Sequence, residues 1–243
     1  RRLEAELEMS QIVQRALLPQ QLPTIEGVDL AAFSRPSEII GGDYFDFFKF
    51  KDGAQGIVIA DVSGHGVSAG MLMSSLQTAL RTMAPDTDSP VEILERINRF
   101  YIHNINITTF VTVFLARFDP VTREFEYVNA GHNPPDLYRG EQGEIMWLMP
   151  TAPAVGLAED YHPQTRSVTL QEGDVLLLYT DGLTEASNGS GNQFGDDRLD
   201  ELIRQNAHLP AAEIIQSLRQ ELSAFNGDRR LEDDITIIAL KVS

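Results

Sequence analysis

The start of the chain mixes apolar side chains with Arg, Glu and Gln and contains no Gly or Pro before Pro19. Because the apolar positions share one face of a helix, the pattern predicts an amphipathic helix over Arg1–Leu18 that Pro19 and Pro23 end. The apolar positions also fit the spacing of a coiled coil, but they cover too few heptads to decide what the helix does. The helix is either a lid packed on the following domain or the end of a longer signalling helix. Its apolar positions are Leu3, Leu7, Ile12, Val13, Ala16 and Leu17.

From Val28 onward the pattern changes to short apolar or alternating runs that Gly, Pro and Asn separate. Runs of this kind predict strands, and the alternation is clearest over Phe125–Val128. The expected strands are Val28–Ser34, Tyr44–Phe50, Gly56–Val62, Phe110–Phe118, Glu124–Asn129, Asp136–Arg139, Glu144–Leu148, Arg166–Leu170, Asp174–Thr180 and Ile235–Val242.

Longer periodic segments between the strands predict four further helices. The segment Ser89-Pro90-Val91-Glu92 has the form of a capping box at the start of one of them. Strand clusters beside helix pairs predict an α+β fold, an antiparallel β-sandwich flanked by helices on both faces. Without a repeat or a long linker, the chain divides into a linker helix, 1–21, and one domain, 22–243. The expected helices are Val67–Met83, Pro90–Asn104, Asp197–Asn206 and Pro210–Phe225.

Charge and composition narrow the function. The 243 residues include 36 Asp and Glu against 19 Lys and Arg, a formal net charge of −17. Such acidity argues against nucleic acid and against an anionic membrane face, since both bind to basic patches. The chain has no Cys, which excludes disulfides and thiolate chemistry. No apolar run approaches the ~18 residues of a membrane span. We therefore expect a cytoplasmic protein, here a fragment that starts at Arg1.

Aspartates stand beside a glycine or a second acid at four expected strand edges. Asp61 and Asp181 directly end apolar strands, where an uncompensated carboxylate would be costly, and no basic residue lies within a few positions of either. A divalent cation would compensate them, and oxygen ligands without Cys favour Mg²⁺ or Mn²⁺. Any single motif is better explained as a turn, whereas four such acids in one domain favour a shared role; spacing alone cannot show that the acids converge. The motifs are Gly41-Gly42-Asp43, Asp61–Gly66, Thr180-Asp181-Gly182 and Asp233-Asp234-Ile235-Thr236.

Six motifs, in this order, closely resemble one protein family. That family is the bacterial sigma-regulatory, stage II sporulation protein E-type branch of the metal-dependent type 2C serine/threonine protein phosphatases. The resemblance covers essentially the whole chain and includes the lead-in helix up to Pro19. The motifs are Gly-Gly-Asp-Tyr-Phe-Asp (41–46), Ala-Asp-Val-Ser-Gly-His-Gly (60–66), Asn-Ala-Gly-His-Asn-Pro-Pro (129–135), Tyr-Thr-Asp-Gly-Leu-Thr-Glu-Ala (179–186), Phe-Gly (194–195) and Asp-Asp-Ile-Thr (233–236).

The resemblance implies two Mn²⁺ or Mg²⁺ ions at one end of a β-sandwich, and a metal-activated water as nucleophile. Asp61 resembles the ligand that bridges both ions, with Val62 contributing its backbone carbonyl. Asp43 would bind one ion, with Gly42 leaving room for the backbone. The other ion would be held by Asp181 and Asp233, with Gly182 and Asp234 in supporting positions beside these ligands. The expected catalytic residues are thus Asp43, Asp61, Asp181 and Asp233.

Two positions depart from the wider type 2C pattern. Ser63 stands where other members have a candidate acid histidine, and we expect His65, two positions later, to shape the loop. His132 stands where the wider family has an aspartate that sometimes binds a third metal. Elsewhere we expect Met71 and Met73 to be core residues of their helix.

The leading interpretation is a protein phosphatase that acts on phosphoserine or phosphothreonine. The resemblance suggests a phosphorylated STAS-type anti-anti-sigma factor as its substrate, in a partner-switching pathway. The first helix would then continue from a sensor or receiver domain outside this sequence and could form a homodimer that sets activity.

Two other functions compete with it. The first is a catalytically retired phosphatase fold that only docks a regulator. The second is a diguanylate cyclase, suggested by Gly41-Gly42-Asp43-Tyr44-Phe45, which lacks the acid of the Gly-Gly-Asp-Glu-Phe signature and leaves the other motifs unexplained.

Overall fold

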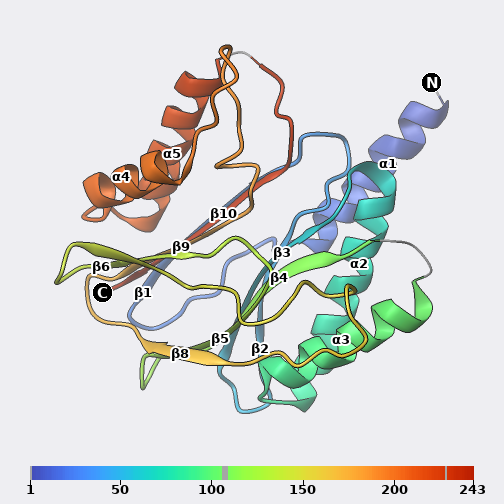
Figure 1. Cartoon of the computed structure of the whole chain (residues 1–243), viewed down its shortest axis with the longest axis horizontal. Coiled ribbons are helices and arrows are strands. Elements are labelled where there is room, and N and C mark those ends of the chain that lie inside the picture. The colour runs from blue at the N-terminus through green and yellow to red at the C-terminus, as the bar shows by residue number, and fades with distance from the viewer. Residues whose placement is uncertain (1, 106–108, 228) are drawn as a thin grey trace. The chain divides into compact units, whose positions relative to one another are not determined.

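The fold is described from a computed structural model that places residues 2–105, 109–227 and 229–243. These residues form two compact units, each assembled from separated segments of the chain (Figure 1). Unit 1 consists of Arg1–Gln21, Glu38–His132 and Pro150–Thr169, and unit 2 consists of Leu22–Ser37, Asn133–Met149 and Leu170–Ser243.

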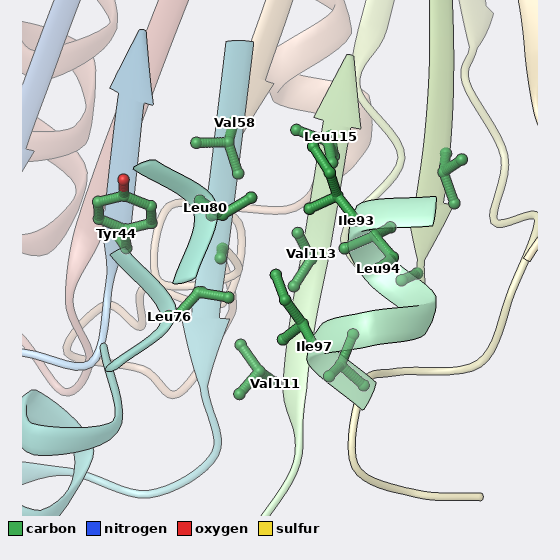
Figure 2. Close-up of a cluster of buried hydrophobic side chains, with 14 of the residues drawn as sticks. Tyr44, Val58, Leu76, Leu80, Ile93, Leu94, Ile97, Val111, Val113 and Leu115 are labelled. Atoms are coloured by element: carbon green, nitrogen blue, oxygen red, sulfur yellow. The ribbon is translucent and has the colours of Figure 1, made fainter. Parts of the chain in front are cut away.

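Unit 1 contains an antiparallel sheet with strand order β2-β3-β4-β5-β8. Buried side chains of β3 and β4, including Val58 and Val113, meet Leu76 and Leu80 of α2 and Ile93 of α3 (Figure 2). The two helices therefore cover the sheet with their apolar faces. The strands are β2 (Tyr44–Lys49), β3 (Gln55–Val62), β4 (Val111–Asp119), β5 (Glu124–Ala130) and β8 (Arg166–Thr169), and the helices are α1 (Arg2–Leu17), α2 (Gly66–Met83), η1 (Ala84–Asp86) and α3 (Pro90–Asn104).

Unit 2 contains a second antiparallel sheet, in the order β1-β10-β9-β6-β7. The buried strands β9 and β10 pack against α4 and α5, for example Leu177 and Ile237 against Leu199 and Ile214. The strands are β1 (Val28–Arg35), β6 (Asp136–Arg139), β7 (Glu144–Trp147), β9 (Val175–Tyr179) and β10 (Ile235–Val242), and the helices are α4 (Asp196–Asn206) and α5 (Ala211–Asn226).

The expected elements are confirmed along the described chain, with ends that differ by at most one residue. Two antiparallel sheets with helices packed on them confirm the α+β class. Among the described residues, no helix is both long and apolar enough to cross a bilayer.

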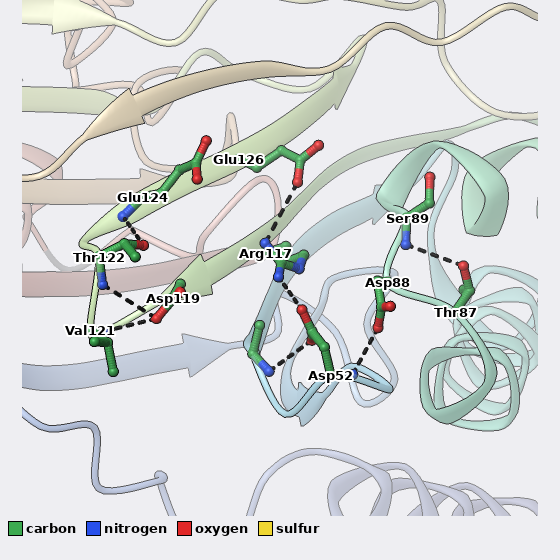
Figure 3. A network of polar contacts seen from close by, with 11 residues as sticks. Asp52, Thr87, Asp88, Ser89, Arg117, Asp119, Val121, Thr122, Glu124 and Glu126 are labelled. Carbon is green, nitrogen blue, oxygen red and sulfur yellow. Dashed lines mark hydrogen bonds and ion pairs between the residues drawn. The ribbon is translucent and has the colours of Figure 1, made fainter.

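Two local predictions were wrong in part. Ser89 caps α3, because its hydroxyl accepts a hydrogen bond from the Glu92 backbone N–H at 3.2 Å. The Glu92 carboxylate does not complete the capping box, since it accepts a hydrogen bond from the Thr87 hydroxyl at 2.6 Å. The same hydroxyl accepts a hydrogen bond from the Ser89 N–H (Figure 3). Met73 is buried as expected, but Met71 is 70% exposed because it lies on the outer face of α2.

The β2–β3 hairpin is anchored at its turn by a polar network (Figure 3). Arg117 of β4 forms ion pairs with Asp52 in the turn and with Glu126 of β5. The backbone N–H of Asp52 donates to Asp88, just before α3, at 2.7 Å. Because a slip of one residue would move every side chain to the other face, this anchor helps to fix the register of β2 against β3.

Helix α1 is tied to the segment that leads into β2. The Gln14 amide donates to the Gly41 carbonyl at 2.6 Å and accepts from the Gly41 N–H at 3.0 Å. Gly70 of α2 permits this approach, since a Cβ there would lie 2.3 Å from Ile40 and 3.0 Å from the Gln14 amide nitrogen. Outside this contact, Met9, Ile12 and Val13 remain exposed.

Candidate metal centre

Unit 1 places Asp43 and Asp61 at the same end of neighbouring strands. Asp43 immediately precedes β2, and Asp61 is the penultimate residue of β3. Tyr44 pairs with Ala60, so the next residues outward along the two antiparallel strands are Asp43 and Asp61. Asp43 is 7% exposed and Asp61 is half-buried. Two carboxylates thus stand at one sheet edge, as the sequence predicts for a hard-metal site.

Gly42 brings its backbone close to both expected ligands of β3. A Cβ at Gly42 would lie 3.0 Å from the Val62 carbonyl oxygen, 3.3 Å from the Ala69 Cβ and 3.5 Å from the Asp61 Oδ1. Only a residue without a side chain leaves this space open. The Val62 carbonyl and the Asp61 carboxylate therefore border the same small gap, which suits an oxygen-bound cation.

Unit 2 places Asp181 and the acids at 233 and 234 at one end of β9 and β10. The Thr180 N–H donates to the Thr236 carbonyl at 3.1 Å, and the Thr236 N–H donates to the Thr180 hydroxyl at 3.0 Å. These bonds hold the end of β9 against the start of β10. A Cβ at Gly182 would lie 2.0 Å from the Asp234 carbonyl oxygen, so the turn after Asp181 requires glycine.

Negative charge accumulates at this end of unit 2. Burial raises the pKa of Asp181, and the carboxylates of Asp233 and Glu185 raise it further, against the effect of nearby backbone N–H groups. Carboxylates that disfavour one another's ionised form are stabilised by a bound divalent cation. The donor set of unit 2 therefore fits a metal ion.

Asp234 has a different role from its neighbour Asp233. Its side chain is buried and accepts hydrogen bonds from the Ser37 N–H at 2.7 Å and the Ser37 hydroxyl at 3.0 Å. It thereby holds the segment after β1 against the start of β10. Asp233 is exposed, and its Oδ1 accepts from the Asp234 N–H at 2.8 Å. The supporting position of Asp234 beside a ligand remains a prediction.

The predicted metal ligands form two groups, one in each unit. Across residues 2–105, 109–227 and 229–243, no three Asp, Glu or His side chains gather closely enough to form a metal centre by themselves. Asp43 and Asp61 remain predicted ligands on one unit, and Asp181 and Asp233 remain predicted ligands on the other.

The two histidines of interest differ in environment. His132 is buried, its Nδ1 forms a 2.8 Å hydrogen bond with the Thr112 hydroxyl, and its backbone N–H donates to Asn129. Thr112 pairs with Asp61 across β3 and β4, a neighbour that sequence reasoning missed because residues distant in the chain become adjacent only in the sheet. His65 is exposed at the start of α2, 3.6 Å from Glu38.

Ser63 closes the loop after Asp61. Its hydroxyl accepts from the Phe110 N–H at 3.0 Å, and its own N–H donates to the Phe110 carbonyl at 3.0 Å. Ser63 therefore pins this loop to the segment that precedes β4.

Comparison with known proteins adds independent findings. A family model described as "Stage II sporulation protein E (SpoIIE)" matches residues 51–243. The phosphoserine phosphatase RsbU of Bacillus subtilis is 30% identical over 239 residues, which is 98% of this chain and 70% of RsbU. The chain spans 41% to 70% of the length of three curated relatives.

Solved structures share the fold. The SiaA-PP2C domain of Pseudomonas aeruginosa superposes with a TM-score of 0.88 at 24% identity, covering 100% of this chain and 98% of that one. RsbX in complex with magnesium superposes with a TM-score of 0.68 at 18% identity, covering 92% and 99% of the two chains. Near-complete coverage in both comparisons shows that the chain has the PP2C fold.

Proposed function

Because the chain belongs to the stage II sporulation protein E (SpoIIE) family and is a serine/threonine phosphatase of the PP2C type, we propose that it dephosphorylates a regulatory protein in a partner-switching pathway. The substrate that we favour is a STAS-type anti-anti-sigma factor carrying phosphoserine or phosphothreonine. Support comes from the similarity to RsbU, a phosphoserine phosphatase.

The observation that carries the proposal is the position of the acids. In each unit, aspartates stand at the ends of paired strands beside a glycine. A Cβ would lie 3.0 Å from the Val62 carbonyl oxygen at Gly42 and 2.0 Å from the Asp234 carbonyl oxygen at Gly182. We propose that Asp43, Asp61 and the Val62 carbonyl would hold one Mn²⁺ or Mg²⁺ ion, and that Asp181 and Asp233 would hold a second. When bound, such ions lower the pKa of a shared water and offset phosphoryl charge.

The protein's own groups orient these ligands. The hairpin register fixes Asp43 beside Asp61, and Asp234 braces the backbone that presents Asp233. A metal-held water requires no cysteine nucleophile, which agrees with a chain that has no Cys. The magnesium bound by RsbX, a structure of the same fold, supports the choice of a hard divalent ion.

The test is hydrolysis of p-nitrophenyl phosphate and of a phosphoserine protein with and without Mn²⁺. We expect metal-stimulated turnover in the intact chain, and its loss in Asp61→Asn and in Asp181→Asn. The matched control is Asp160→Asn, which removes one exposed carboxylate from a loop of unit 1. Absence of turnover on both substrates, or full activity of both site variants, would contradict the proposal.

The alternative of a retired docking domain is less well supported, because Asp43, Asp61, Asp181 and Asp233 are all present. The cyclase alternative has no support in the PP2C fold.

We further propose that residues 1–21 act as a linker that regulates domain 22–243. The two hydrogen bonds between Gln14 and Gly41 connect α1 to a loop residue two positions from Asp43. The exposed Met9, Ile12 and Val13 offer a surface for a homodimer or for a preceding sensor or receiver domain. Activity and light-scattering mass should change when residues 1–18 are deleted, and Gln14→Ala should reproduce the change in activity. If deletion altered neither quantity, the regulatory role would be wrong.

A further inference from the structure

A basic groove lies within unit 2, between the end of β1, the end of α5 and the segment before β10. Its volume is about 400 Å³, and three arginines line it: Arg35, Arg219 and Arg229. No acidic residue is among the described residues that line it. The guanidinium of Arg219 lies 4.0 Å above the ring of Phe33, which holds this side chain in place.

The charge of this groove is opposite to that of the chain. The protein carries a net charge of −17 and only 19 Lys and Arg in total. In the part of the chain that the structure describes, no carboxylate forms an ion pair with Arg35, Arg219 or Arg229. Three exposed guanidinium groups in one groove form a site for an anion, because Arg matches carboxylate and phosphate oxygens with paired donors.

The groove continues along an edge strand. A second hollow of about 490 Å³ lies between β1 and α5 and shares Phe33, Arg219 and Ser223 with the first. Strand β1 is eight residues long and is the last strand of its sheet. An edge strand beside a groove is a common receptor for an extended peptide. The shape therefore suits a short extended segment with its acidic part at the arginines.

The basic end of the groove adjoins the predicted metal ligands of unit 2. Ile235, which lines the groove, directly follows Asp234 in the chain. Ser37, two residues beyond Arg35, donates hydrogen bonds from its N–H and its hydroxyl to Asp234. Its carbonyl accepts a hydrogen bond from the Arg230 guanidinium at 3.3 Å. An acidic segment in the groove would thus lie next to the end of the sheet that carries Asp181 and Asp233.

We propose that this groove binds an acidic segment of the phosphoprotein substrate, adjacent to its phosphorylated residue. The inference rests on the proposed phosphatase function and adds a determinant of substrate choice. The carboxylates of that segment pair with Arg35, Arg219 and Arg229. An acidic chain would otherwise repel an acidic partner, so the groove supplies the local attraction that the net charge does not.

The first test measures binding without catalysis. The probe is a fluorescein-labelled, unphosphorylated peptide of alternating Glu and Asp. It has about eight residues, the length of β1. A second peptide, with Gln and Asn in place of Glu and Asp, is the neutral control. Fluorescence anisotropy in EDTA should show binding of the acidic peptide, weakened as NaCl rises from about 0.05 to about 0.3 M. In the triple variant Arg35→Gln, Arg219→Gln, Arg229→Gln, affinity should fall about tenfold.

A matched triple variant controls for net charge. Lys49→Gln, Lys51→Gln and Arg99→Gln remove three exposed cations from unit 1, and this variant should bind within about twofold of the wild type. Equal affinity for the two peptides, or equal loss in both triple variants, would overturn the proposal. If a wild-type dimer became monomeric only in the arginine variant, the groove would be a contact between copies and the proposal would be wrong.

The second test separates this proposal from the phosphatase function. For phosphoserine peptides with acidic or neutral flanks, the wild type should favour the acidic flank through KM, and the arginine variant should lose this preference. Binding of the acidic peptide without hydrolysis of any phosphoester would refute only the phosphatase function. Metal-dependent hydrolysis with equal KM for both flanks would refute only the groove. If the triple variant misfolds by circular dichroism, single Arg35→Gln and Arg229→Gln variants must each show part of the loss.

Discussion

Asp136→Asn should stabilise the protein at neutral pH. Asp136 begins β6 and is 1% exposed, and no cation forms an ion pair with its carboxylate in the described part of the chain. Burial raises the pKa of Asp136 to about 8, and the carboxylates of Asp200 and Asp196 on α4 act in the same direction. The indole of Trp147 and the guanidinium of Arg204 act in the opposite direction without offsetting burial.

The direction in which stability changes with pH follows from the protons that Asp136 binds in the folded and in the unfolded state. The unfolded chain releases the Asp136 proton near the ordinary aspartate pKa of 3.8, whereas the folded chain keeps it up to about pH 8. Stability is therefore greatest below the unfolded pKa and falls as pH rises towards 8, by about 1.4 kcal/mol per pH unit. Between the unfolded pKa and neutral pH, the free energy of unfolding therefore falls by about 4 kcal/mol. An amide at position 136 cannot ionise and avoids this loss.

Urea unfolding of the wild type and of Asp136→Asn at about pH 5.5, 6.5 and 7.5 measures the effect. The variant should gain stability over the wild type with each step in pH, by about 1.4 kcal/mol per unit. Glu172→Gln, an exposed acid of the same unit, controls for the loss of one negative charge. A stability difference independent of pH, or a variant less stable than the wild type at every pH, would refute the reasoning.

Three further outcomes test other parts of the structure. Gly182→Ala should lower the free energy of unfolding by about 2 kcal/mol, because its Cβ would lie 2.0 Å from a backbone carbonyl oxygen. The control Gly189→Ala, whose Cβ would lie 3.4 Å from its nearest neighbour, should lower it much less, and thermal melting of the two variants measures the difference. Arg81→Gln should cost about 3–5 kcal/mol in urea unfolding, since it leaves the fully buried Asp46 carboxylate without its cation, and adding Asp46→Asn should recover part of the loss. Mn²⁺ at about 100 times its Kd should stabilise the wild type by about 2.7 kcal/mol in thermal melting and should not stabilise Asp61→Asn; equal stabilisation of both would exclude Asp61 as a ligand.

The pattern of adjacent residues was sufficient to predict the helices and strands. Alternation in β5, Gly and Pro at the turns and the Ser89 cap are each properties of a few adjacent residues, so the sequence predicted α3 with its observed ends. The order of short motifs likewise indicated the phosphatase family, which the match over residues 51–243 confirmed. The grouping of Asp43 with Asp61 followed once their strands were known to be antiparallel neighbours.

Contacts between distant segments could not be predicted in this way. The exposure of Met71, the bonds between Gln14 and Gly41 and the burial of Asp136 depend on which surface a neighbouring element covers. The basic groove combines Arg35 with arginines nearly 200 positions away, and no sequence window contains both.

The sequence by itself determined the elements, the family and the candidate metal ligands, because propensity, turn chemistry and motif order are encoded in neighbouring residues. Only the tertiary structure decided which charges lie together and which side chains lose contact with water. Those properties depend on distances in space, and packing sets these distances by bringing remote segments together.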